Sequence, residues 1–92
     1  MPKVVVACGS GVATSQVVAD RLRRLLGERG VVAEVVACPV GELAQNLVDA
    51  DAYVSVVKAD DHADVPVFNG VAFLTGQGQQ EELDRLAKVL RG

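Results

Sequence analysis

A cysteine followed by a run of small residues is the feature of this sequence with the clearest chemical potential. Cys8 comes directly after the apolar run Val4–Ala7. The residues that follow it are Gly9, Ser10, Gly11, Val12, Ala13, Thr14 and Ser15, and an amphipathic segment comes next. A strand, a Gly-rich turn and a helix start gather backbone N–H groups around one point, and the helix dipole adds positive potential there. The stretch therefore predicts an anion site, with phosphate as the expected anion and Cys8 as a thiol of lowered pKa at its mouth.

The loop chemistry distinguishes a phosphoryl carrier from a phosphatase. A Cys8 thiolate can attack a phosphoryl donor, and loop N–H groups with the hydroxyls of Ser10, Thr14 and Ser15 would hold the resulting phosphocysteine. Cysteine-based phosphatases also need an arginine six positions after the cysteine, for bidentate phosphate binding, and an acid for the leaving group. Thr14 occupies that sixth position. The sequence therefore favours a carrier, which picks up a phosphoryl group, holds it and passes it on, over a phosphatase.

The composition bounds the class of protein. Ninety-two residues, half of them apolar, predict one domain over residues 1–92. The formal net charge of −3 argues against a nucleic-acid partner. No apolar run reaches the ~20 residues of a membrane span, and no secretion signal is recognisable, so we expect a cytoplasmic protein that is not itself membrane-embedded. Two cysteines thirty positions apart and one histidine predict no metal site, and no cofactor is indicated.

Alternating strands and helices are predicted from the periodicity of apolar residues. The predicted strands are residues 3–7, 31–38 and 52–57, and the predicted helices are 15–28, 41–47 and 79–90. Thr14 or Ser15 is the expected N-cap of the first helix, and Gly30 its left-handed terminator. Residues 66–74 fit two structures: a hairpin around Asn69-Gly70 or a parallel strand near 71–74. The alternation of elements favours the parallel strand.

The predicted fold class is α/β. The order of elements indicates a small three-layer, Rossmann-like or flavodoxin-like domain, with a four-stranded parallel sheet and helices on both faces. In such sheets ligands bind beyond the carboxyl ends of the strands, where the strand order reverses. Cys8 ends the first strand, so we expect it at that edge together with the turn Thr75–Gly78, whose glycines are predicted to be turn and capping residues.

At this point the chain resembles a known family. Residues 4–15, with Val-Ala-Thr-Ser at 12–15, are similar to the signature of the IIB component of the bacterial sugar phosphotransferase system, in its galactitol-type branch. Cys38, the Asp64-Val65-Pro66 step and residues 69–78 also occur in the family's order. The resemblance covers nearly the whole chain.

The resemblance implies a function and partners. Cys8 would be the phosphorylated nucleophile, and Gly9, Ser10, Gly11, Val12, Ala13, Thr14 and Ser15 would form the phosphate cradle. The phosphoryl group would come from a phosphohistidine of the IIA protein and pass to a sugar or polyol carried by the membrane protein IIC. The loop does not fix the substrate, because related branches handle galactitol, arabitol-like polyols, ascorbate and other sugars.

Two other functions stay open. One is a small cysteine phosphatase or arsenate reductase, and the other is a regulatory IIB-like module. Cys38 is expected to be a packed small residue rather than a disulfide partner of Cys8, because structural disulfides are rare in the cytosol.

The remaining charged residues have plain interpretations as well as functional ones. His62, in a polar loop with three aspartates, is expected to be solvated rather than a proton shuttle or metal ligand. Arg21, Arg23 and Arg24 are expected to form a solvated helix face, with docking of an acidic partner as the alternative.

Overall fold

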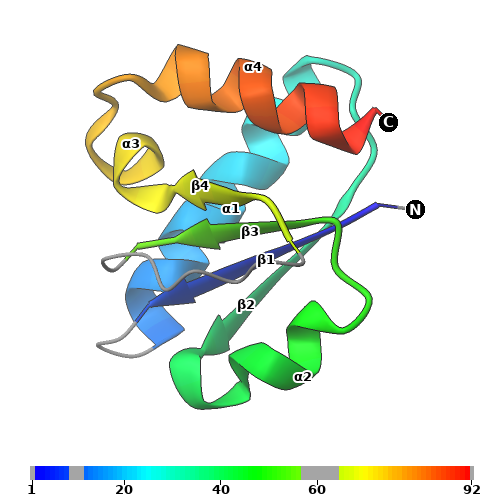
Figure 1. Cartoon of the computed structure of the whole chain (residues 1–92). Coiled ribbons are helices and arrows are strands. Elements are labelled where there is room, and N and C mark those ends of the chain that lie inside the picture. Colours follow the sequence, from blue (N-terminus) through cyan, green and yellow to red (C-terminus); the bar gives the residue numbers. More distant parts are fainter. Residues whose placement is uncertain (1, 9–11, 57–64, 92) are drawn as a thin grey trace.

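The computed structural model describes residues 2–8, 12–56 and 65–91 (Figure 1). The elements in chain order are β1 (Lys3–Cys8), α1 (Val12–Glu28), β2 (Glu34–Pro39), the 3-10 turn η1 (Val40–Glu42), α2 (Leu43–Leu47), β3 (Ala52–Ser55), β4 (Val67–Asn69), α3 (Gly70–Thr75) and α4 (Gln79–Leu90). The strands form one parallel sheet in the order β2-β1-β3-β4. This confirms the prediction of a small α/β domain with a four-stranded parallel sheet.

The two faces of the sheet carry separate apolar clusters, because successive strand residues point to opposite faces. Val4 and Val6 belong to the larger cluster, with the buried sides of α1 and α4. Val5 and Ala7 belong to the smaller cluster, with Leu43 of α2. Both faces are therefore covered, which explains why the strand sequences are continuously apolar rather than alternating.

Helix α1 begins earlier than predicted and ends where predicted. Thr14 and Ser15 lie inside its first turn, so the expectation that one of them is the N-cap is wrong. The physical reason is packing: Ser15 is 0% exposed and opens the buried stripe that continues with Val18 and Leu22. At the other end Gly30 has φ 70°, and the N–H of Val31 donates to the Leu26 carbonyl at 2.9 Å. This is the predicted left-handed helix end.

The segment 66–74 contains neither a hairpin nor a strand at 71–74. The fourth strand is β4, and residues 70–75 form α3 instead. The side chain of Asn69 accepts a hydrogen bond from the Val71 N–H at 3.0 Å and so caps α3. Asn69-Gly70 thus starts a helix and not a turn, and Gly76 ends that helix with φ 87°. The number and direction of the strands are confirmed, but the position of the fourth strand is corrected.

The other boundaries shift by a few residues. Strand β2 begins at Glu34, because the Val31 N–H is taken up by the end of α1. Pro39 is the last residue of β2 rather than the first residue after it, and β3 ends at Ser55. The predicted helix 41–47 is observed as η1 followed by α2, and the predicted helix 79–90 is α4.

Gly70 brings α3 unusually close to the end of β3. A Cβ atom at this position would lie 2.8 Å from the Ser55 carbonyl oxygen and 2.9 Å from Cγ2 of Val56. Both distances are shorter than a normal contact, and the first partner is backbone, which cannot rotate away.

Substitution of Gly70 by alanine is therefore expected to destabilise the fold by about 2 kcal/mol, because α3 must move away from β3. Equilibrium denaturation in urea measures this free energy of unfolding. The matched control is Gly27→Ala: apart from the adjoining backbone of α1, no atom lies within 4 Å of the added Cβ, so α1 should gain about 0.5 kcal/mol. Equal effects of the two substitutions would contradict the close approach at Gly70.

Candidate functional site

The reversal of strand order places the end of β1 at the natural ligand position of this fold. The chain passes from β1 through α1 to β2 on one side, and then through α2 to β3 on the other side of β1. The carboxyl ends of β1 and β3 therefore flank the switch point, where open α/β sheets bind ligands (Figure 1). The N–H of Val56 donates to the Ala7 carbonyl at 3.1 Å, which holds the chain after β3 beside the end of β1.

The first turn of α1 is suited to an anion. Helix α1 begins at Val12, four residues after Cys8, and its first turn contains no acidic residue. The N–H groups of a first helical turn have no acceptor within the helix, and the dipole there favours negative charge. Ala13 is exposed, Thr14 is half-buried and Ser15 is buried. Solvent therefore reaches the Thr14 side chain but not that of Ser15.

Part of the predicted cradle lies outside the described residues. This holds for Gly9, Ser10 and Gly11 and for the side chains of Cys8 and Val12. Their roles as nucleophile and phosphate ligands remain predictions, supported by the placement of the strand end and the helix start on either side of them.

Helix α3 and the turn after it complete this edge of the sheet. Helix α3 follows β4 directly and packs against α1. The next turn lies at the carboxyl edge, as predicted (Figure 1). Gly76 ends α3, and Gly78, with φ 71°, is the N-cap of α4, which confirms their predicted turn and capping roles. The Thr75 hydroxyl accepts a hydrogen bond from the Gln77 N–H at 3.2 Å.

Sequence reasoning missed three exposed apolar residues on α1 and α3, two helices that pack against each other. They are Val17 on α1, 51% exposed, and Val71 and Leu74 on α3, 41% and 39% exposed. We call this set the site-edge patch. The sequence predicts residues 71–74 as a parallel strand, whereas they lie in α3. The signal for the correct assignment was Asn69 as a helix cap with Gly76 as a stop six residues after Gly70.

Cys38 is a buried, free thiol on the neighbouring strand. It pairs in register with Ala7 and is 4% exposed in the smaller core cluster. Burial raises the pKa of the Cys38 thiol and the Glu42 carboxylate raises it further, while Lys3 and a hydrogen bond with Asn46 lower it by less. This confirms the prediction of a packed small residue, and it makes Cys38 a poor nucleophile.

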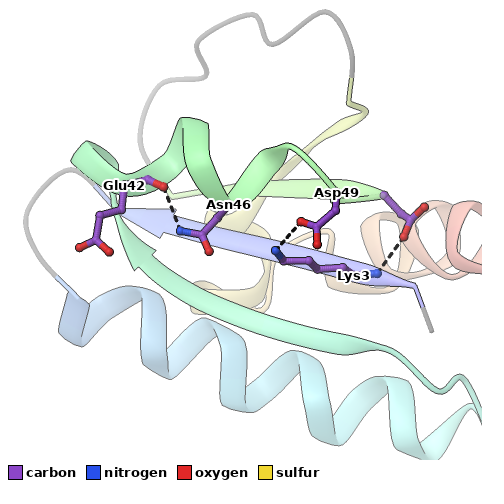
Figure 2. Close-up of polar contacts among 5 residues, drawn as sticks. Lys3, Glu42, Asn46 and Asp49 are labelled. Atoms are coloured by element: carbon purple, nitrogen blue, oxygen red, sulfur yellow. Dashed lines mark hydrogen bonds and ion pairs between the residues drawn. The ribbon is translucent and has the colours of Figure 1, made fainter.

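Polar contacts stabilise the start of α2 and bind the turn after it to β1 (Figure 2). The Asn46 side-chain amide donates to the Glu42 carbonyl at 2.9 Å. The Lys3 ammonium lies 2.7 Å from the Asp49 carboxylate, and its backbone N–H donates to Asp51 at 2.9 Å. The hydrogen bond and charge of Lys3 hold the pKa of Asp49 below its usual range. These contacts position the face that covers Cys38.

The structure describes the arginine candidates on α1 but not His62. Arg23 is bound to Asp20 at 2.6 Å and to the Val35 carbonyl at 2.7 Å, so it ties α1 to β2. Arg24 is exposed and Arg21 is half-buried. His62 and its aspartates lie outside the described residues. Within residues 2–8, 12–56 and 65–91, no group of His, Cys, Asp and Glu side chains is arranged to hold a metal ion.

The fold and site together define a class: a small open parallel α/β domain whose switch point combines a cysteine-bearing strand end with an acid-free helix start. Residues 3–85 match the sequence profile described as "PTS system, Lactose/Cellobiose specific IIB subunit". The chain therefore belongs to the IIB family of the sugar phosphotransferase system, as the loop motif indicated.

Two relatives from Escherichia coli K12 resemble the chain over most of its length. A putative phosphotransferase enzyme IIB component, SgcB, is 36% identical over 76 residues, which is 83% of each chain. The galactitol-specific EIIB component is 28% identical over 91 residues, which is 98% of this chain and 97% of the relative. Among the described helices, none is both long and apolar enough to cross a membrane.

The two cysteines are expected to differ sharply toward alkylation. In the native protein, iodoacetamide at neutral pH should modify Cys8 and leave Cys38 unmodified, because Cys38 is buried and its pKa is raised. Peptide mass analysis locates the added group. The control is the Cys8→Ser variant. When folded, this variant should take up no label, and when unfolded, it should be labelled at Cys38. Labelling of Cys38 in the native protein would show that its burial is not protective.

Proposed function

We propose that this IIB component is a cytoplasmic phosphoryl carrier that uses Cys8. It accepts a phosphoryl group from a phosphohistidine of a IIA protein and passes it to a sugar or polyol held by a membrane IIC protein. The observation that carries the proposal is the position of Cys8 at the end of the central strand, with the first turn of α1 beginning four residues later. The galactitol-specific relatives make a polyol such as galactitol the first substrate to test.

The proposed chemistry consists of two displacements at phosphorus. In the first, the Cys8 thiolate attacks, the P–N bond breaks, and the imidazole of the donor leaves with the electron pair. In the second, a substrate hydroxyl oxygen attacks, the P–S bond breaks, and the thiolate leaves. The hydroxyl proton passes to a base on the acceptor side. Backbone N–H groups at the start of α1 would stabilise the charge on the transferring oxygens in both transition states.

The position of Thr14 supports a carrier over a phosphatase. Thr14 lies in the first turn of α1, where a phosphatase would place its phosphate-binding arginine. The first arginine of the helix is Arg21, seven residues further, which is about 10 Å along the axis. A bidentate arginine contact to a phosphoryl group on Cys8 is therefore not supplied by α1 near the loop.

Replacement of Cys8 by serine should abolish phosphorylation by phosphorylated IIA, because a hydroxyl lacks the thiolate's nucleophilicity at neutral pH. Intact mass after incubation with the phosphorelay proteins should show one added phosphoryl group in the unaltered protein and none in Cys8→Ser. The matched control Cys38→Ser removes the other thiol and should still be phosphorylated.

The lability of the added group tests the chemistry separately. The mass gain should follow the acid and alkaline stability of a thiophosphate ester. Full phosphorylation of Cys8→Ser would overturn the assignment of the nucleophile, and rapid hydrolysis of an aryl phosphate would favour the phosphatase instead.

The site-edge patch is proposed to contact the protein partners of transfer. Exposed apolar side chains on packed helices beside a reactive edge are typical of interaction surfaces. Val71 and Leu74 are three residues apart on α3 and so lie on one helix face. An uncharged surface is also compatible with a site that gains and loses a phosphoryl charge.

The variants Val17→Asp and Leu74→Asp should slow phosphorylation by IIA at least about tenfold, equivalent to about 1.4 kcal/mol of lost binding in the transition state. Rapid-quench mass measurements give the rates. Alkylation of Cys8 by iodoacetamide should be unchanged, since that reagent needs no docking. The control Val48→Asp alters an 86% exposed apolar residue after α2 and should have no effect. Equal slowing by all three substitutions would reject the patch as the docking surface.

A further inference from the structure

A second surface feature lies at the outer edge of the sheet, away from the switch point. An open groove of about 330 Å³ runs between β4 and α4, and its lining residues are Pro66, Phe68, Arg85, Lys88 and Val89. Strand β4 is the edge strand, and β3 separates it from β1. The groove therefore belongs to neither the Cys8 loop nor the site-edge patch.

The groove combines apolar lining residues with cationic ones: Pro66 is exposed and Val89 is half-buried, while Phe68 is only 4% exposed. The guanidinium carbon of Arg85 lies 5.5 Å from the centroid of the Phe68 ring, within the range of a cation–π interaction. Its Nη1 also lies 2.6 Å from Oε1 of Glu82. These two contacts place the guanidinium over the Phe68 ring, and the Arg85 side chain is 64% exposed, so a ligand carboxylate can reach it.

Glu82 also determines how a ligand can bind at this edge. Its Oε2 accepts a hydrogen bond from the Asn69 N–H of β4 at 2.9 Å. This contact occupies one of the outward donors through which another strand would extend the sheet. Recognition in the groove must therefore rest more on side chains than on strand addition, with apolar contact to Pro66 and Val89 and charge contact to Arg85 and Lys88.

The rim is positive on a protein that is negative overall. Lys88 is exposed and has no ion-pair partner among the described residues. Arg85 forms an ion pair with one carboxylate, that of Glu82. The chain as a whole carries a formal charge of −3. Two cations beside apolar lining residues complement an apolar side chain with carboxylates next to it.

We propose that this groove binds a segment of a partner protein in which apolar residues are flanked by acidic ones. The apolar side chain lies against Pro66 and Val89, and the carboxylates face Arg85 and Lys88. Because the groove is on the edge strand, a bound segment leaves the end of β1 open. The proposal goes beyond phosphoryl transfer and does not depend on it.

The test is an NMR titration of the whole chain with short, end-blocked peptides. The first peptide contains two leucines flanked by glutamates; the second replaces glutamate by lysine, and the third replaces leucine by serine. The first should shift the signals of the Phe68 ring and the Val89 methyl groups in a saturable way. The second and third should bind at least about tenfold more weakly, because one lacks the charge and the other the apolar anchor.

Variants locate the binding. Arg85→Glu with Lys88→Glu should weaken binding of the first peptide at least about tenfold. Lys88→Glu alone should weaken binding of this peptide severalfold. This second variant separates binding from stability, because Lys88 forms no hydrogen bond or ion pair among the described residues, whereas Arg85 pairs with Glu82. The matched control, Arg21→Glu with Arg24→Glu, makes the same change in net charge on α1 and should bind as the unaltered protein does.

Three results would overturn the proposal. They are equal affinity for all three peptides, equal weakening in the α1 control, and signal shifts confined to α1 and α3. Self-association would also overturn it: a concentration-dependent dimer that is lost in Lys88→Glu would assign the groove to a second copy of this chain. Sedimentation of the free protein distinguishes that outcome.

Discussion

Burial of β1 on both faces is the constraint on which the rest of the structure depends. Its four central residues, Val4 to Ala7, are fully buried, and it pairs with β2 on one side and β3 on the other. A strand held in this way has no freedom to shift, because a slip by one residue would exchange the two faces. Cys8 is the last residue of that strand, so its backbone takes its position from the core and not from the loop that follows it.

Helix α1 supplies the other fixed end of the loop, and its position also comes from packing. Leu22 and Leu26 are almost fully buried, and each contributes roughly 2 kcal/mol of burial free energy. Ser15 is buried at the start of the same stripe, and Gly30 ends the helix. Under the proposed function, a segment tethered to two rigid elements suits a carrier that meets two partners in the same geometry, since neither end has to be ordered on binding.

Features that depend on residues close in the sequence could be predicted from it. Features that depend on tertiary packing could not. The end of α1 at Gly30 and the helix at 79–90 follow from a turn glycine and helical spacing, which act within a few residues. Val71 to Leu74 fit a buried strand equally well, because a short apolar run has no clear period. The cap at Asn69 is a local signal that favours a helix there, and the close approach of Gly70 to Ser55 is a tertiary contact that the sequence pattern does not show. Ser15 was misassigned because its residue type favours caps, whereas the core needed a small buried side chain.

The two proposed interaction surfaces, the site-edge patch and the groove between β4 and α4, differ in charge. A phosphoryl group on Cys8 would add a charge of about −1.5 to −2 to a chain that already carries −3. The site-edge patch beside the loop is apolar, so its contacts change little when that charge comes and goes. The cationic groove lies two strand spacings from β1, about 10 Å across the sheet, which exceeds the screening length of about 8 Å at physiological salt. A segment held in the groove would therefore bind almost equally well before and after transfer, while contacts at the loop are made and broken.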